Sequence, residues 1–187
     1  MRVFLIRHPR PAVEPGTCYG ATDLDLADEV RDCAARLREL LPARIRLFSS
    51  PLLRCQRLAE ALHDAPRYDR RLREMDFGAW ELRSWNEIPR DQLDAWAAAP
   101  LTYAPPGGES VGALRERVTA FLVEHIGADD EDLAVVTHAG VMRILAAQLQ
   151  GLDQETWFKL RFGYGELSLL DVPASHPRLR PGGPPGA

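Results

Sequence analysis

Short uninterrupted apolar runs alternate with helical apolar stripes along this chain, and this alternation constrains the fold more than any other feature. Residues 3–6, 45–48 and 133–136 are such runs, a pattern typical of strands that are buried on both faces of a parallel sheet. Segments with helical periodicity lie between them. The order predicts an α/β fold, a three-layer sandwich with a mainly parallel central sheet and helices on both faces.

The remaining elements are predicted from periodicity and from residues that start or stop helices. Helices are expected at residues 27–41, 52–62, 84–99, 110–126 and 141–149, and further strands at 68–72 and 166–172. In the first helix one apolar stripe comprises Val30, Cys33, Ala34, Leu37, Leu40 and Leu41. Asp25 and Asp28 are predicted to form the capping pair of this helix, and Pro42 to stop it.

The chain of 187 residues is long enough for one domain with a hydrophobic core and too short for two full ones. We expect that domain to cover residues 1–172. Residues 173–187 contain five prolines and three glycines, a composition that predicts a disordered tail.

Charge and composition argue against several classes of protein. The net charge is −4, from 27 acidic and 23 basic residues, which disfavours binding to nucleic acid or to anionic membranes. No apolar stretch approaches the roughly 20 residues that span a bilayer, and the start of the chain does not resemble a signal peptide. Three widely spaced cysteines predict neither a disulfide framework nor a metal site. We therefore expect a reduced cytoplasmic protein.

Polar residues of one chemical character follow three of the predicted strands. Arg7 and His8 follow the first, Ser49 and Ser50 with Arg54 follow the second, and Thr137 and His138 follow the run at 133–136. In open α/β sheets ligands bind beyond the carboxyl ends of the strands. If these strands are adjacent and parallel, two imidazoles and two guanidiniums converge there.

This set of side chains suits a phosphoryl group. Arginine binds phosphate oxygens with two parallel hydrogen bonds, and the N-terminus of the helix after His138 adds oriented N–H groups. A neutral imidazole is a nucleophile near pH 7. Taken singly, each of these residues is more often structural or solvated, so the prediction depends on their coincidence. The other histidines, the cysteines and the four tryptophans are predicted to be structural.

Four motifs, in order, resemble those of the histidine phosphatase superfamily, the phosphoglycerate mutase-like enzymes. Residues 5–8, Leu-Ile-Arg-His, resemble its Arg-His-Gly signature, and residues 49–59 its Ser-x-Leu-x-Arg segment. Residues 72–81 resemble its Leu-x-Glu-x-x-x-Gly-x-Trp-Glu segment, and residues 137–140 its Ser/Thr-His-Gly-Gly segment. Residues 107–110 also recur in the family. Residues 19–24 and 75–78 resemble the α-ribazole phosphatase branch, whose members act in cobalamin synthesis.

The resemblance implies a phosphoglycerate mutase-like fold and a phosphatase that acts on a small phosphomonoester. His8 is implied as the nucleophile, and Arg7, Arg54 and His138 as the groups that hold the phosphoryl oxygens. Glu74 is implied as the general acid for the leaving oxygen and then as the base for water, with Glu81 as its nearest competitor. No metal and no cofactor are implied. The oligomeric state is left open.

The chain departs from the family pattern at two places. Pro9 and Arg10 stand where the family has glycine and a small polar or acidic residue, and Leu82 stands where glycine follows Trp-Glu. Proline fixes φ and removes one N–H, so Arg10 either replaces that donor or points to solvent. Three alternatives therefore stay open: a phosphoglycerate-type mutase, a catalytically silent phosphate-binding domain, and a protein phosphohistidine phosphatase.

Overall fold

The computed structural model describes residues 1–126 and 131–172. Within them one sheet has the strand order β3-β2-β4-β1-β5. The strands are β1 (Arg2–Arg7), β2 (Arg46–Ser49), β3 (Arg67–Tyr68), β4 (Leu133–Thr137) and β5 (Leu167–Asp171). The neighbours β3, β2, β4 and β1 pair in parallel and β5 is antiparallel to β1. The prediction of a mainly parallel α/β sheet is confirmed.

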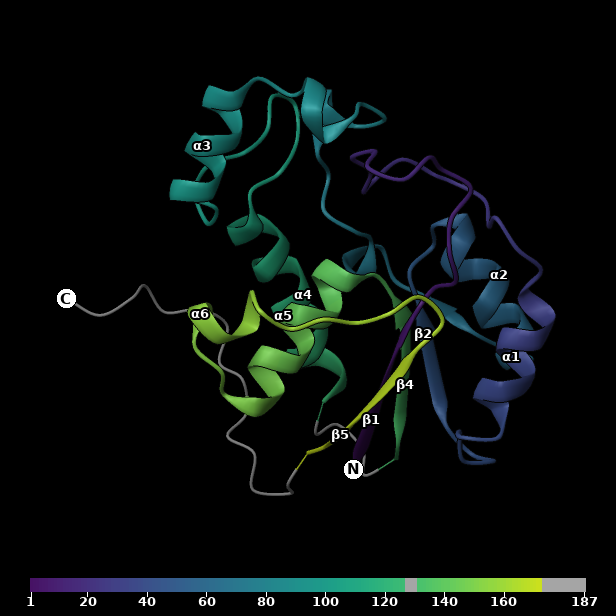
Figure 1. The fold of residues 1–187 in the computed structure, drawn as a ribbon. Coiled ribbons are helices and arrows are strands. Elements are labelled where there is room, and N and C mark those ends of the chain that lie inside the picture. Colours follow the sequence, from purple (N-terminus) through teal and green to yellow (C-terminus); the bar gives the residue numbers. More distant parts are fainter. Residues whose placement is uncertain (127–130, 173–187) are drawn as a thin grey trace.

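Helices cover both faces of the sheet, as Figure 1 shows, with α1 and α2 on one face and α4 and α5 on the other. The helices are α1 (Val30–Arg38), α2 (Leu53–Leu62), α3 (Arg90–Ala98), α4 (Val111–His125), α5 (Ala139–Gln150) and α6 (Gln154–Trp157). Successive residues of β1 face opposite sides, so Phe4 and Ile6 join the core under α1 and α2, while Val3 and Leu5 join the core under α4 and α5. This two-sided burial explains the uninterrupted apolar run.

The first helix is shorter than the predicted 27–41. It begins at Val30 and ends at Arg38, so Leu40 lies beyond it and is 56% exposed. The predicted Asp25–Asp28 capping pair is wrong. Asp25 forms an ion pair with Arg57, and Asp28 forms one with Arg10. Long-range ion pairs therefore occupy both carboxylates, which local spacing alone does not reveal.

Two other predictions need correction. The strand expected at 68–72 consists only of Arg67–Tyr68, and Arg70–Leu72 forms a 3-10 turn that is capped by the Asp69 side chain. The helix expected at 84–99 is divided into a 3-10 turn at Trp85–Glu87 and α3. Pro89 causes the division, because a proline disfavours the helical conformation at the residue before it.

Two long segments lie over the carboxyl ends of the parallel strands, where a ligand site is expected. One is the loop between β1 and α1, and the other runs from the 3-10 turn at Arg70–Leu72 through α3 to α4 (Figure 1). Within the described part of the chain, no helix is both long and apolar enough to cross a membrane. The predicted tail at 173–187 lies outside the described residues.

Candidate active site

The three strand ends that were predicted to converge lie side by side. In the register of the sheet Arg7 pairs with Thr137, and Ser49 pairs with Val136, so β4 lies between β1 and β2 with its end level with theirs. The rings of His8 and His138, which follow β1 and β4, are 5.0 Å apart between centroids. Both imidazoles are buried, and so is the side chain of Arg54.

His8 is held by a backbone hydrogen bond that leaves one ring nitrogen available. Its Nδ1 lies 2.6 Å from the carbonyl oxygen of Pro9. Because a carbonyl can only accept, Nδ1 carries the proton and Nε2 keeps its lone pair. Burial and the nearby Arg54 guanidinium lower the pKa of His8 to about 3. The ring is therefore neutral near pH 7.

The two predicted phosphate-binding arginines are anchored by backbone carbonyls. Nη1 of Arg7 donates to Phe162 O at 2.7 Å, and its guanidinium lies 3.8 Å from the centre of the Tyr164 ring. Arg54 donates to the carbonyls of Thr22 and Gly20 at 2.8 and 2.6 Å. The Nε atoms of both arginines are buried without a hydrogen-bond partner among the described residues. An oxyanion can accept hydrogen bonds from both of these Nε–H groups.

Glu81 organises the loop that anchors Arg54. Its carboxylate accepts hydrogen bonds from the backbone N–H groups of Gly20, Ala21, Thr22 and Phe77, and from the Thr22 hydroxyl. Burial raises the pKa of Glu81, but these hydrogen bonds outweigh burial and leave the pKa below its usual value. Gly20 has no room for a side chain, since a Cβ there would lie 1.8 Å from Met75 O.

His138 is the N-cap residue of α5 and bonds to the end of β2. Its Nε2 lies 2.9 Å from Ser50 Oγ, which also accepts the N–H of Leu52 at 3.3 Å. The Ser50 hydroxyl can donate to Nε2 or accept from it, because its oxygen has two acceptor sites and Leu52 N–H uses one. Burial, followed by the charge of Arg54, lowers the pKa of His138 well below its usual value.

Glu74 lies at the N-terminus of α5, the helix that His138 caps, and it lines one cavity together with His8. Its Oε2 accepts from Gly140 N and its Oε1 from Met75 N, each at 3.0 Å. A Cβ on Gly140 would lie 2.3 Å from Oε1, so a larger residue there would displace this carboxylate. The glycine of the Thr-His-Ala-Gly motif thus makes space for a side chain 66 residues earlier in the chain.

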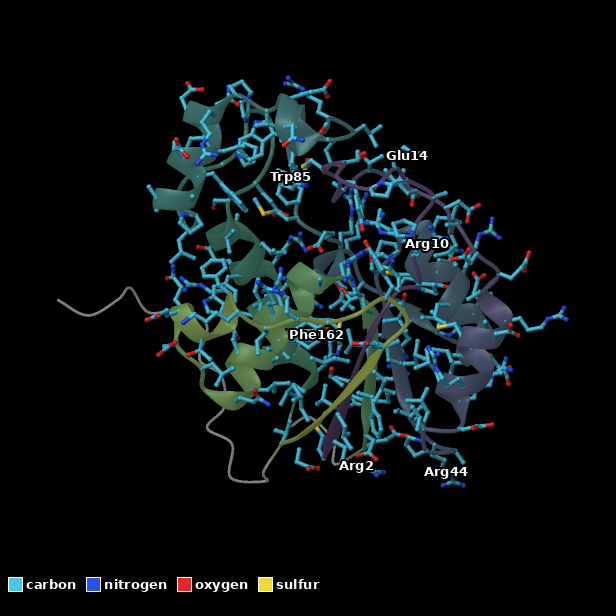
Figure 2. All side chains as sticks on the ribbon, viewed as in Figure 1. Arg2, Arg10, Glu14, Arg44, Trp85 and Phe162 are labelled. Carbon is cyan, nitrogen blue, oxygen red and sulfur yellow. The ribbon has the colours of Figure 1, made fainter. Side chains whose placement is uncertain are left out.

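Arg7, His8 and Glu74 open into a cavity of 460 Å³ that is mostly apolar. Its aromatic lining comprises Tyr19, Phe77, Trp85, Trp96, Trp157 and Phe158. All four tryptophans are predicted from the sequence to be structural. That holds for Trp80, which is 1% exposed, whereas the other three line this cavity. Figure 2 shows Trp85 in the segment over the strand ends.

Sequence analysis also missed Arg143, which lines the same cavity. Its Nε donates to Leu160 O at 3.0 Å, and burial lowers its pKa. A signal was present, because Arg143 is the only charged residue in α5. A single charged side chain on an otherwise apolar, buried helix indicates a polar environment, because packing against the core does not require a charge there.

The departures from the family pattern have different structural consequences. Pro9 still supplies the carbonyl that holds His8. The Arg10 guanidinium forms an ion pair with Asp28 at 3.0 Å, and both side chains are 61% exposed, so Arg10 points toward solvent (Figure 2). Leu82 has a φ of 62°, a left-handed conformation that glycine adopts without strain.

Comparisons with known proteins agree with this arrangement. The glucosyl-3-phosphoglycerate phosphatase of Mycolicibacterium vanbaalenii is 31% identical over 100% of this chain and 88% of its own. The adenosylcobalamin/alpha-ribazole phosphatase of Escherichia coli is 28% identical over 96% and 94%. A crystal structure of phosphoglycerate mutase from Thermus thermophilus has 34% identity and a TM-score of 0.73, and covers 92% of this chain and 94% of its own.

The model of the histidine phosphatase superfamily (branch 1) matches residues 3–181. This span contains all four motifs and both histidines that meet beyond the sheet. The chain therefore belongs to branch 1 of the histidine phosphatase superfamily.

Proposed function

We propose that this protein is a metal-independent phosphomonoesterase that works through a phosphohistidine on His8. The observation that carries the proposal is the neutral imidazole of His8, held through Nδ1 with Nε2 free, in one cavity with Arg7 and Glu74. The guanidiniums of Arg7 and Arg54, each with a buried Nε that has no partner among the described residues, supply the charge that a phosphate dianion requires. A silent binding domain would not require a free lone pair at this position.

In the first step Nε2 of His8 attacks the phosphorus atom and the ester P–O bond breaks. Arg7 and Arg54 offset the repulsion between the lone pair and the phosphate, and His138 donates a hydrogen bond to an equatorial oxygen. Protonated Glu74 gives its proton to the leaving alkoxide. The products are the alcohol, phospho-His8 and the Glu74 carboxylate.

In the second step a water molecule attacks the phosphorus atom of phospho-His8. The Glu74 carboxylate takes one proton from this water, the N–P bond breaks, and inorganic phosphate is released. His8 regains its lone pair and Glu74 is again protonated. Glu74 fits both tasks because it lines the same cavity as His8, whereas Glu81 does not line that cavity and its hydrogen bonds are made to the loop and to Phe77.

The aromatic lining of the cavity supports a leaving group with a planar apolar part. Aromatic side chains bind such groups by stacking and edge contacts, and Trp85 and Trp96 already stack on each other with ring centroids 6.4 Å apart. Among the relatives, the E. coli enzyme is named for α-ribazole. We therefore propose α-ribazole 5′-phosphate as the substrate, which would place the protein in the cytoplasm and in cobalamin synthesis.

The test is phosphate release from a panel of monoesters that contains α-ribazole 5′-phosphate, glucosyl-3-phosphoglycerate and 3-phosphoglycerate. The highest kcat/KM is expected for the first. Conversion of 3-phosphoglycerate to 2-phosphoglycerate without phosphate release would instead identify a mutase. Quenching without acid should trap an acid-labile, base-stable adduct on His8. A His8→Ala variant that keeps more than about 1% of kcat would contradict the mechanism.

A further inference from the structure

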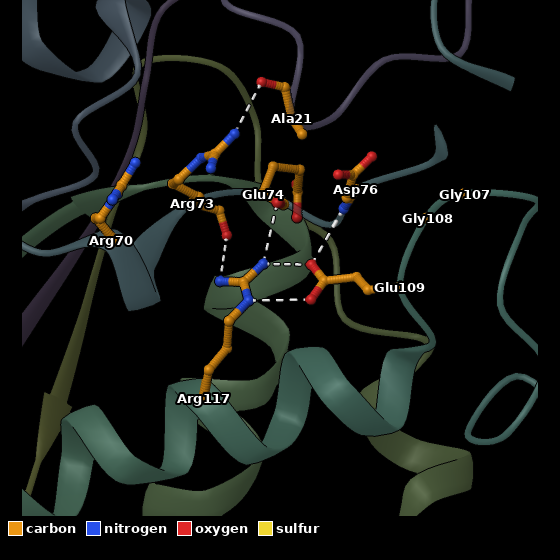
Figure 3. Close-up of a pocket in the computed structure, with 9 residues that line it drawn as sticks. All are labelled: Ala21, Arg70, Arg73, Glu74, Asp76, Gly107, Gly108, Glu109 and Arg117. Carbon is orange, nitrogen blue, oxygen red and sulfur yellow. Dashed lines mark hydrogen bonds and ion pairs between the residues drawn. The ribbon is translucent and has the colours of Figure 1, made fainter. Parts of the chain in front are cut away.

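A second cavity, of 250 Å³, shares the lining residue Glu74 with the catalytic cavity, and Figure 3 shows the residues around it. Of the described residues that line the two cavities, Glu74 alone lines both. The second cavity has no aromatic lining. It is lined by Ala21, Arg70, Arg73, Glu74, Asp76, Gly107, Gly108, Glu109 and Arg117. Charged side chains therefore dominate the lining of this cavity, in contrast to the mostly apolar lining of the cavity that contains His8.

Two arginines are brought together by the short 3-10 turn at Arg70–Leu72. Side chains at positions i and i+3 eclipse one another in such a turn, so Arg70 and Arg73 project from the same side, as Figure 3 shows. The Arg70 guanidinium has no ion pair or hydrogen bond with the described residues. Arg73 has a single long contact, 3.4 Å to Ala21 O, and its buried Nε has no partner within residues 1–126 and 131–172.

The carboxylates of this cavity, in contrast, already have hydrogen-bond donors. Glu109 accepts from the Arg117 guanidinium and from Asp76 N, and Asp76 accepts from Gly78 N at 2.8 Å. Glu74 accepts from two backbone N–H groups. Arg70 and Arg73 therefore supply the unused hydrogen-bond donors of this cavity, and their planar forks suit an oxyanion.

Arg117 makes the cavity wall rigid. It reaches from α4 and donates to the backbone carbonyls of Arg71, Arg73 and Glu74 at 2.6 to 3.0 Å. Figure 3 shows Arg117 below Arg73 and Glu74, paired with Glu109. Arg117 therefore holds the backbone segment that carries both Arg73 and Glu74, and Glu109 neutralises the charge of Arg117.

We propose that this second cavity is a subsite for a carboxylate or phosphate group, held by Arg70 and Arg73 beside Glu74. This inference rests on the proposed function in one respect, because the proposed mechanism places the ester oxygen of the substrate at Glu74. α-Ribazole 5′-phosphate carries one phosphate and no second anionic group, so with that substrate the subsite takes a free oxyanion, whereas a substrate such as 3-phosphoglycerate can reach Arg73 with its own carboxylate. A free oxyanion can occupy the same subsite, since the chemistry that recognises it is the same.

The test compares Arg70→Gln/Arg73→Gln with a charge-matched control, Arg31→Gln/Arg44→Gln, which changes two exposed arginines outside both cavities. The first readout is the ratio of kcat/KM for 3-phosphoglycerate to that for glycerol 3-phosphate, which lacks the carboxylate. If the substrate supplies the anion, this ratio falls at least about tenfold in the first variant and not in the control. Arg73→Lys, which keeps the charge and loses the fork, should give an intermediate ratio.

The second readout requires no turnover. Orthovanadate first fills the catalytic phosphate site, and sodium sulfate is then added while thermal unfolding is followed. If a free oxyanion binds, sulfate raises the Tm of the wild type and of the control but not of Arg70→Gln/Arg73→Gln. Unchanged substrate ratios together with equal sulfate effects in all variants would overturn the subsite. Wild-type protein that hydrolyses no monoester but still shows the sulfate difference would count against the proposed function alone.

Discussion

The carbonyl oxygen of Pro9 lies 2.6 Å from Nδ1 of His8, the residue directly before it in the chain. Proline at this position removes an N–H that glycine would offer, yet it keeps the carbonyl and restricts φ. The hydrogen bond that orients the imidazole is therefore compatible with this departure from the family motif. A Pro9→Gly variant should keep this hydrogen bond, because glycine supplies the same backbone carbonyl.

The buried imidazole of His8 makes stability depend on pH. Its pKa is about 3 in the folded protein and about 6.5 when unfolded. Between these values the unfolded chain binds a proton that the folded protein does not, so the unfolding free energy decreases as the pH falls from 7 to 4. Below pH 6 this contribution approaches about 1.4 kcal/mol per pH unit. His8→Asn should show a shallower decline in urea unfolding, and parallel curves for variant and wild type would contradict the lowered pKa.

Glu74→Gln should slow phosphoenzyme formation from alkyl monoesters by about 10²–10⁴-fold. An aryl phosphate with an acidic phenol should lose far less, because its oxygen leaves without a proton. The measurement is the burst phase with both substrates. Glu81→Gln is the matched control, since it perturbs the loop at Gly20–Thr22 that anchors Arg54. It should affect both substrates alike, and the opposite pattern would exchange the roles of Glu74 and Glu81.

The aromatic cavity should determine the preference for the leaving group. Trp85→Leu removes one aromatic face of the lining, so kcat/KM for α-ribazole 5′-phosphate should fall about tenfold while that for glycerol 3-phosphate changes little. Steady-state kinetics with the two substrates gives the comparison. An equal loss with both would indicate a general change of the fold rather than a specificity effect.

Leu82 should be a site of stored backbone strain. A left-handed conformation costs a residue with a side chain roughly 1–2 kcal/mol, and the Leu82 side chain is 56% exposed, so it contributes little packing. Leu82→Gly should therefore be more stable than Leu82→Ala by about 1 kcal/mol in chemical denaturation. The alanine variant keeps the strain and controls for loss of the leucine side chain.

Chelators should leave the activity intact. Across residues 1–126 and 131–172 no group of three or more His, Cys, Asp or Glu side chains is arranged to hold a metal ion, and the proposed steps use protein groups only. Phosphate release is measured after dialysis against EDTA. Loss of activity that one divalent metal restores would refute metal independence.

Much of the fold was predictable because its signals are local. The two-sided burial of β1 and β4 leaves uninterrupted apolar runs, and a helical stripe marks α4. Errors arose where a distant residue changes the outcome. Asp25 is paired with Arg57 rather than capping α1, and no pattern near residue 25 indicates this partner.

The sequence by itself determined the sheet, the family and the residues His8, Arg7, Arg54 and His138 at three strand ends, because motif and strand lie in one short stretch of chain. The resemblance implied Glu74 as the acid, but only the tertiary structure decided what surrounds Glu74 and Glu81. The two carboxylates are seven residues apart in one motif, and they differ in what folds against them. Gly140 makes space for Glu74 in the cavity that His8 also lines, whereas the N–H groups of a loop 60 residues away surround Glu81. Such contacts depend on how distant segments pack, and packing is decided by the whole chain.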